Sequence, residues 1–235
     1  MTRRFFLALC ALLALASPVM AKPRARPTGT VHVRLVTGDG PIVLALDARH
    51  APKTTANFLA YVDDGRFDGV TFYRSARNRV APKFGFIQGG IGTEAQRILP
   101  PFPLETTART GLHHLDGTIS MARRADPNSA GGNFFITVGA LPSMDAHGTE
   151  PGYAAFGQVV SGMDTVRRIL AEPTGGRMGG QMLLHEVKLI KAVRLDGTPR
   201  PTNLPRPWLM STGPARPGTP TRRTPPPRPA PRPHP

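Results

Sequence analysis

Short β-rich segments, separated by turn-forming residues, run through most of this chain and restrict the folds that it can adopt. The first two alternate apolar and polar residues over 31–35 and 42–46, with Gly38-Asp-Gly40 between them, which predicts an antiparallel hairpin. Further runs, each bounded by Gly, Pro, Asn or Asp, follow at 70–74, 84–88, 118–122, 134–138, 154–160 and 183–195. So many short strands favour a closed antiparallel barrel or a sandwich.

Two stretches change from a period of two to a helical period. Residues 51–64 repeat apolar side chains at helical spacing, with Pro52 in the first turn and Gly65 after the last. Residues 163–170 do the same and stop before Pro173. We therefore expect a mostly β fold with two helices.

The first 21 residues have the layout of a secretory signal peptide. Arg3 and Arg4 precede an apolar run over 5–16, and small residues lead to Ala21. This run is shorter than the roughly 20 residues that span a bilayer, so we expect cleavage near Ala21 and export. The single cysteine, Cys10, lies inside this segment, and the expected mature chain therefore has no disulfide and no cysteine metal ligand.

The C-terminal residues 199–235 carry much of the formal net charge of +15. They are rich in Pro, Arg and Thr and contain no acidic residue. Such a segment buries too little apolar area to offset its ordering entropy, so we expect a disordered tail with polyproline II character. A contact arm for anionic partners and a solvated spacer are both compatible with it. Trp208 could dock on the domain or anchor the tail to another surface.

Two apolar segments, GTISMAR at 117–123 and GNFFIT at 132–137, could line a groove, and neither carries a nucleophile, a metal-ligand set or a phosphate loop. This favours peptide binding over bond cleavage. Arg74 follows aromatic residues at the end of a strand and offers a permanently charged fork of donors. Gln88 adds a neutral donor and acceptor. Taken alone, each also fits an ordinary structural interpretation, as a surface arginine and a turn-stabilising glutamine.

His113 and His114, followed by Asp116, raise the question of a metal site. Adjacent residues in a strand point to opposite faces, which argues against a shared metal ion. We therefore expect a solvated turn here, and no metal or cofactor.

Five segments occur in the order found in cyclophilin-type peptidyl-prolyl cis-trans isomerases, and the chain resembles a bacterial exported member of that family. Each motif is weakly specific alone, but their ordered combination is highly specific. The resemblance covers a domain over 30–196 and implies an eight-stranded antiparallel barrel capped by two helices. It also implies a periplasmic location. The segments are TFYR at 71–74, GFIQGG at 85–90, GTISMAR at 117–123, NFFI at 133–136 and GYAAFGQV at 152–159.

The resemblance also implies roles for individual residues. Arg74 corresponds to the catalytic arginine of the family. Phe86, Phe135 and Met144 correspond to walls of the pocket that holds the proline ring. The other implied substrate contacts, through side chain or backbone, are Gln88, Ala122, Arg123, Asn133 and Tyr153.

The sequence departs from the family pattern at several positions. Asn133 replaces the usual glutamine, so its amide reaches less far. The link between Arg74 and Gly85 is longer than usual and basic. Gly85 itself stands where a pocket phenylalanine is usual, so either Phe84 or Phe86 must fill the space.

Together these features predict a prolyl isomerase that needs no cofactor and acts as a monomer on proline-containing polypeptides of folding exported proteins. Two alternatives remain open at this point. The domain could bind peptides or act as a chaperone without catalysis, or the function could lie in the basic tail and its anionic partners.

Overall fold

The computed structural model describes residues 29–210 of the 235-residue chain. The expected signal segment over 1–21, and residues 211–235 of the expected tail, lie outside the described residues.

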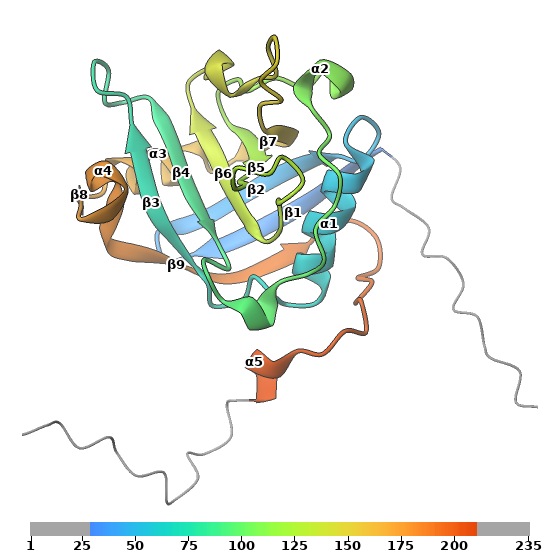
Figure 1. Cartoon of the computed structure of the whole chain (residues 1–235). Coiled ribbons are helices and arrows are strands. Elements are labelled where there is room, and N and C mark those ends of the chain that lie inside the picture. Colours follow the sequence, from blue (N-terminus) through green and yellow to red (C-terminus); the bar gives the residue numbers. More distant parts are fainter. Residues whose placement is uncertain (1–28, 211–235) are drawn as a thin grey trace, which may run out of the picture.

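Eight antiparallel strands close into a barrel. In the order of their pairing, the ring runs β1-β2-β7-β5-β6-β4-β3-β9 and returns from β9 to β1 (Figure 1). A ninth strand, β8 (Thr174–Gly175), pairs with β9 outside this ring. The predicted eight-stranded barrel is therefore confirmed. The strands of the ring are β1 (Thr30–Thr37), β2 (Gly40–Asp47), β3 (Thr71–Arg77), β4 (Gly85–Gly90), β5 (Thr118–Met121), β6 (Asn133–Val138), β7 (Ala154–Ser161) and β9 (Met182–Arg194).

The first hairpin shows how the alternating pattern builds the barrel. Val33 and Leu35 on β1, and Ile42 and Leu44 on β2, are fully buried, whereas Arg34 between them is exposed. A strand places successive side chains on opposite faces, so the apolar set points into the barrel and the polar set points outward. The hairpin predicted from the sequence is confirmed by the pairing of β1 with β2.

Two helices cover the barrel on opposite sides (Figure 1). Helix α1 (Pro52–Asp63) begins with a proline in its first turn and buries a face that includes Phe58. The Phe58 ring lies 5.0 to 5.4 Å from those of Phe67, Phe134 and Phe156, so α1 seals one end of the aromatic core. Helix α3 (Met163–Ala171) lies against β3 and β4. Both predicted helices are confirmed.

Short helical turns connect these elements. Among residues 29–210, no helix is long and apolar enough to cross a membrane. The turns are α2 (Thr107–Thr110), α4 (Arg177–Gly180), α5 (Pro207–Met210), and the 3₁₀ segments η1 (Ala95–Arg97) and η2 (Pro142–Met144).

Residues 200–208, which we call the C-terminal strap, belong to the range 199–235 expected as a tail and contact the barrel. The backbone N–H of Arg200 donates to Asp63 Oδ2 at 2.9 Å, and that of Thr202 donates to Asp64 Oδ1 at 2.6 Å. Both carboxylates are buried at the end of α1. Buried carboxylates need hydrogen-bond donors, and the strap provides them. Composition alone does not reveal such polar anchoring.

The C-terminal end of the strap packs against two arginines of the domain. Arg66 is 2% exposed and donates from Nη2 to the carbonyl of Pro205 at 3.2 Å. The guanidinium carbons of Arg66 and Arg97 lie 4.6 and 5.3 Å from the Trp208 ring. Of the two interpretations of Trp208, the structure supports docking on the domain.

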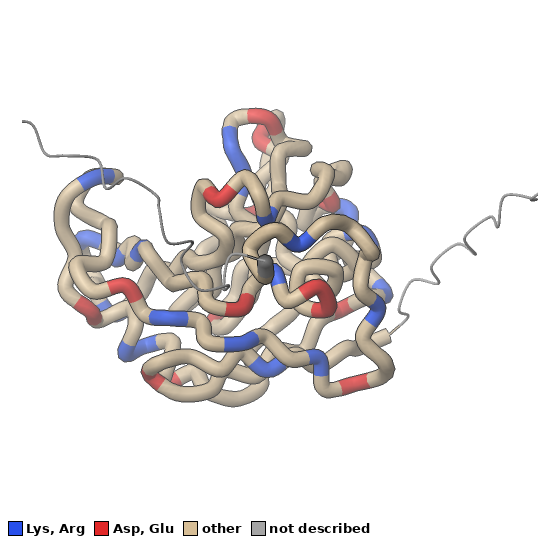
Figure 2. The backbone as a smooth tube through the Cα atoms, turned by 90° about the horizontal axis from the view of Figure 1, so that it is seen from below, with Lys and Arg blue, Asp and Glu red and all other residues tan. Residues whose placement is uncertain are grey.

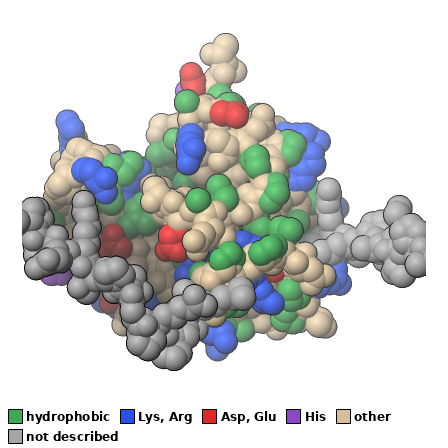
Figure 3. Space-filling view, turned by 60° about the horizontal axis from the view of Figure 1, so that its bottom comes forward, with side chains coloured by type: hydrophobic (Ala, Val, Ile, Leu, Met, Phe, Trp, Pro, Cys, Tyr) green, Lys and Arg blue, Asp and Glu red, His purple; other side chains and the backbone are tan. Residues whose placement is uncertain are grey.

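The surface of the described region is mixed in character. Lys and Arg are spread around the fold and interspersed with Asp and Glu (Figure 2). On the face shown in Figure 3, apolar side chains form several small patches that charged and polar groups interrupt.

Candidate active site

Three neighbouring strands bring three of the predicted site residues into one row. Arg74 on β3 pairs with Gln88 on β4, and Gln88 pairs with Phe135 on β6. Residues directly opposite one another share a face of the sheet. Ile87, next to Gln88 on β4, is fully buried and points into the barrel, so Gln88 and its partner Arg74 face outward. Tyr73 is an extra residue on β3 between the pairs Phe72–Gly89 and Arg74–Gln88, and this bulge puts Arg74 on the face opposite to buried Phe72.

The Arg74 guanidinium is held from two sides by glutamine side chains. Its Nη1 donates to Gln88 Oε1 at 2.9 Å. Its Nε and Nη2 donate to Gln181 Oε1 at 3.0 and 2.6 Å. The guanidinium carbon lies 5.0 Å over the Phe86 ring. Burial lowers the pKa of Arg74 from its ordinary value, and Tyr73 and Tyr153 act in the opposite direction.

Aromatic side chains form a wall beside this cation. The Phe135 ring lies 5.3 Å from that of Phe86 and 5.5 Å from that of Tyr153, which it meets edge to face. Met144, in η2, accepts a backbone hydrogen bond from Tyr153 at 3.0 Å. Phe86, Phe135 and Tyr153 therefore form one apolar surface next to a fork of N–H donors, with the backbone of Met144 beside it.

Phe86, not Phe84, occupies the space left by Gly85. Phe86 is half-buried between Arg74 and Phe135, whereas Phe84 is 40% exposed. The Phe84 ring lies instead over Gly139, where a Cβ atom would come within 2.6 Å of it. Gly85 itself has φ of +145°, and a Cβ there would stand 2.1 Å from the carbonyl of Ala76. No side chain fits at this position, which accounts for the departure from the family pattern.

Arg123 is anchored by its own surroundings. Its Nε donates to the Gly152 carbonyl at 2.9 Å, and its Nη1 donates to the Arg124 carbonyl at 3.0 Å. The guanidinium lies 4.9 Å from the Tyr153 ring. The preceding residue, Ala122, donates its N–H to Asn133 at 2.9 Å. The side chain of Arg123 thus joins two loops at the edge of the aromatic wall.

Asn133 acts as a clamp within the protein. Its Oδ1 accepts the N–H of Gly92 at 2.8 Å, and its Nδ2 donates to the carbonyl of the same residue at 2.9 Å. The Tyr73 hydroxyl lies 3.3 Å from the same Oδ1, and it also receives a hydrogen bond from Gln88 Nε2 at 2.9 Å. The shorter amide of Asn133 therefore holds the turn after β4 and is linked to Gln88 through Tyr73.

The sequence predicts a solvated turn at His113 and His114. This prediction is wrong for His114. The side chain of His113 is 59% exposed, but that of His114 is fully buried, as expected for neighbours on opposite faces. His114 Nδ1 lies 2.5 Å from Asp145 Oδ1, and its Nε2 lies 2.9 Å from Ser120 Oγ. The His114 ring stacks on that of Phe135 with centroids 5.7 Å apart.

Hydrogen bonds link Ser120 to His114 and His114 to Asp145, as in the serine, histidine and aspartate triad of a hydrolase. Ser120 is fully buried, however, and is not accessible to a substrate. Burial lowers the pKa of His114, which the Asp145 carboxylate opposes. Burial alone would raise the pKa of Asp145, but hydrogen bonds with His114 and His113 lower it. The three residues support the back of the aromatic wall.

Gln181 was missed by the sequence reasoning. It stands after a glycine-rich turn and before β9, where neither a helical nor a strand period marks it. The only sequence signal is the run of glycines, which predicts a tight turn but not the direction of the following side chain.

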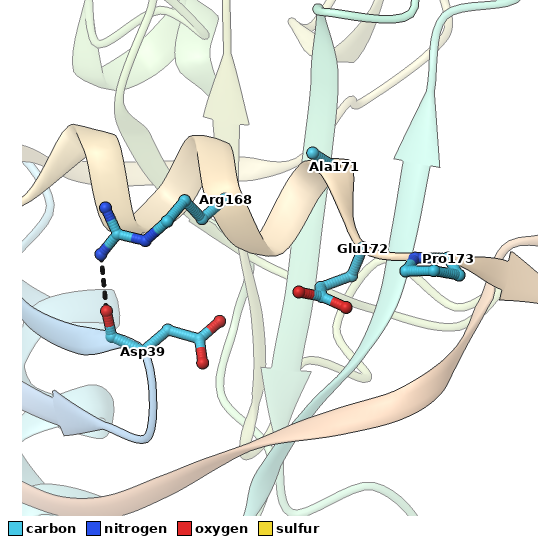
Figure 4. Close-up of a pocket in the computed structure, with 5 residues that line it drawn as sticks. All are labelled: Asp39, Arg168, Ala171, Glu172 and Pro173. Atoms are coloured by element: carbon cyan, nitrogen blue, oxygen red, sulfur yellow. Dashed lines mark hydrogen bonds between the residues drawn. The ribbon is translucent and has the colours of Figure 1, made fainter.

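A separate open hollow of about 430 Å³ lies beside the end of α3. Its lining residues are Asp39, Arg168, Ala171, Glu172 and Pro173, and Figure 4 shows Arg168 bonded to the Asp39 carbonyl, at 2.6 Å. None of the predicted site residues lines it. In the region that the structure describes, no group of three or more His, Cys, Asp or Glu could hold a metal ion.

Comparisons with known proteins all point to one protein family. The family model described as "Cyclophilin type peptidyl-prolyl cis-trans isomerase/CLD" matches residues 32–194. Peptidyl-prolyl cis-trans isomerase A of Dickeya dadantii is 36% identical over 169 residues, which cover 72% of this chain and 85% of that protein. Peptidyl-prolyl cis-trans isomerase B of Escherichia coli is 33% identical, with 68% and 96% covered.

A solved cyclophilin-type isomerase of Cryptosporidium parvum has a similar fold. It superposes with a TM-score of 0.58 at 25% identity, and the match covers 72% of this chain and 99% of that one. A second structure of that protein, in the presence of the dipeptide Ala-Pro, gives a TM-score of 0.57.

Proposed function

Since the chain belongs to the family of cyclophilin-type peptidyl-prolyl cis-trans isomerases, we propose that it catalyses rotation about peptide bonds before proline in the groove beside Arg74. Phe86, Phe135 and Met144 hold the proline ring, and Arg74 stabilises the twisted amide. One observation carries the proposal: a guanidinium fixed by two glutamines stands directly against an aromatic wall.

The reaction needs no nucleophile and no metal. A peptide bond rotates over a barrier of about 18 to 20 kcal/mol because its conjugation must be broken. As planarity is lost, the nitrogen regains a lone pair, which Arg74 can stabilise by donating a hydrogen bond. Interactions that are stronger in the twisted state than in either planar isomer lower the barrier.

The size of the effect requires more than one contact. A rate gain on the order of 10⁴ corresponds to about 5.4 kcal/mol. One hydrogen bond from a charged donor contributes roughly 1.5 to 3 kcal/mol. The fit of the proline ring against Phe86 and Phe135, and the water that it displaces, supply the remainder.

Gln88 has two tasks in this proposal. Its Oε1 orients Arg74, and its Nε2 donates one hydrogen to Tyr73. An amide nitrogen carries two hydrogens, so the second one can donate to a carbonyl of the substrate backbone. Ala122 and Arg123 present backbone groups to the peptide, and Tyr153 extends the apolar wall. Asn133 contributes by holding the turn at Gly92.

An isomerisation assay on a proline peptide tests the role of Arg74. We expect Arg74→Ala to lower kcat/KM at least about tenfold, since it removes a charged donor. Arg34→Ala, which removes an exposed arginine from β1, is the matched control and should leave the rate unchanged. Equal rates in a folded Arg74→Ala protein would contradict the mechanism. Peptide affinity without any acceleration in the unaltered protein would instead indicate a pure binding module.

We also propose that the protein is exported to the periplasm and assists the folding of other exported proteins. The proposal is supported by the basic, apolar and small-residue order of positions 1–21. Mass spectrometry of the mature N-terminus and fractionation of cells test it. A mature chain that begins after Ala21 supports the proposal, and a chain that retains this segment in the cytoplasm refutes it.

A further inference from the structure

We propose that Gln181 is a positioning residue of the isomerase, which holds the Arg74 guanidinium in the orientation that the reaction uses. The inference rests on the catalytic role proposed for Arg74. Gln181 Oε1 accepts from both Nε and Nη2 of Arg74, at 3.0 and 2.6 Å. A single acceptor that binds two donors of one planar group fixes the group more firmly than one hydrogen bond does.

The number of N–H groups on Arg74 shows how many of them remain free to bind the substrate. A guanidinium carries five N–H groups. Gln181 engages two of them and Gln88 engages one. Two N–H groups therefore remain for a twisted amide. Gln181 and Gln88 therefore set which edge of the cation the substrate meets.

Both hydrogen-bond partners of Arg74 are neutral amides, so neither offsets its positive charge. Within the described part of the chain, no Asp or Glu forms an ion pair with Arg74. A carboxylate in the place of Gln181 would fix the guanidinium equally well but would neutralise much of its field at the amide nitrogen. A glutamine orients the cation without that loss.

An irregularity in the sheet brings Gln181 to this place. The pairing of β3 with β9 passes from Phe72 and Val187 directly to Arg74 and Met182, so residues 183–186 bulge out of register. The Gln181 carbonyl then accepts the Ser75 N–H at 3.0 Å. Bulges are known to redirect side chains next to active sites.

The turn before Gln181 carries backbone strain. Met178 has φ of +56° although it is not a glycine, and Gly176, Gly179 and Gly180 are also positive. This conformation costs an L-residue on the order of 1 to 3 kcal/mol and persists only where the surrounding structure enforces it. The strained turn and the bulge together fix the backbone from which the Gln181 side chain reaches Arg74.

A double-mutant cycle tests the proposal in the full-length protein. Gln181→Met keeps the side-chain length but removes the acceptor, and Gln158→Met is the matched control at an exposed glutamine on β7. We expect Gln181→Met to lower kcat about tenfold with a smaller change in KM, and Gln158→Met to change neither. In the Arg74→Ala background, Gln181→Met should add no further loss, because its effect acts through Arg74.

The outcomes separate this inference from the proposed function. An unchanged kcat for Gln181→Met, with Arg74→Ala impaired, refutes the positioning role alone. An equal loss from Gln181→Met with and without Arg74 also refutes it, since a general structural defect would give that result. Full activity of Arg74→Ala refutes the role of Arg74 and, with it, that of Gln181. Thermal unfolding checks that each variant folds, and Gln181→Ala replaces Gln181→Met if that variant does not fold.

Discussion

The guanidinium carbon of Arg74 lies 5.0 Å over the ring of Phe86, so the cation and one wall of the apolar pocket contact each other directly. In the mechanism proposed above, a substrate proline that packs on Phe86 brings its preceding amide next to Arg74. Under that proposal the pocket positions the reacting bond, and the cation acts on it.

The shape of the cation should matter as much as its charge. Arg74→Lys keeps a positive charge but cannot donate to Gln88 and Gln181 as a planar fork. We expect kcat/KM to fall about tenfold or more, because one charged hydrogen bond is worth roughly 1.5 to 3 kcal/mol. An isomerisation assay measures the change, with Arg34→Lys as the control. Activity near that of the unaltered protein would show that charge alone suffices.

The two phenylalanines that flank Gly85 should differ in function. Phe86→Ala removes a half-buried ring between Arg74 and Phe135. We expect a loss in kcat/KM of about tenfold or more, since a bound proline would complete the burial of this ring and full burial of such a side chain is worth roughly 1.5 to 3 kcal/mol. Phe84→Ala removes an exposed ring above Gly139 and should leave kcat/KM nearly unchanged. The same peptide assay measures both. A larger loss in Phe84→Ala would place the pocket on the other side of Gly85.

Stability should fall as the pH drops below the ordinary pKa of histidine. Burial lowers the pKa of His114 in the folded protein, so the unfolded chain binds its proton more readily, at about pH 6.5. The contribution of neutral His114 is complete above that pH and is lost as the pH falls below it. The loss approaches about 1.4 kcal/mol per pH unit for one proton.

Urea unfolding at pH 7.5 and pH 5.5 measures this dependence. We expect His114→Gln to reduce the difference between the two pH values. The control, His185→Gln, alters an exposed histidine and should retain the difference. An identical pH dependence in the unaltered protein and in His114→Gln would contradict the assignment.

The C-terminal strap should stabilise the domain. A chain that ends at residue 198 leaves the buried Asp64 without its two hydrogen bonds from Thr202, and an unsatisfied buried group costs roughly 1 to 3 kcal/mol. A chain that ends at Met210 keeps these contacts and is the control. Urea unfolding should show a lower midpoint for the shorter chain only. Equal midpoints would mean that water replaces the strap without loss.

The sequence was sufficient to predict the barrel because its strands bury one face and expose the other. Val33, Leu35, Ile42 and Leu44 repeat with the period of a strand, and that period leaves one way to bury them. Arg74, Gln88 and Phe135 could be predicted as a group because their motifs stand on strands that pair in register.

Contacts between side chains that lie far apart in the sequence could not be predicted in the same way. Gln181 reaches Arg74 through a bulge, and a bulge leaves no periodic signal. Thr202 and Trp208 lie in a proline-rich segment whose composition predicts disorder, yet buried Asp64 and Arg66 bind it. Asn133 looked like a shortened substrate ligand, and only its distance to Gly92 shows that it clamps a turn.

The closure of the barrel sets the order in which the enzyme is completed during synthesis. Val33 on β1 pairs with Arg194 on β9, so one edge of the first strand has no partner until almost the whole described chain has been made. Pairings between distant segments form slowly. Met182, which lies opposite Arg74, belongs to the same last strand, so the surroundings of Arg74 are completed at the final step. Until then the growing chain, which already contains many prolines, belongs to the class of proline-containing polypeptides.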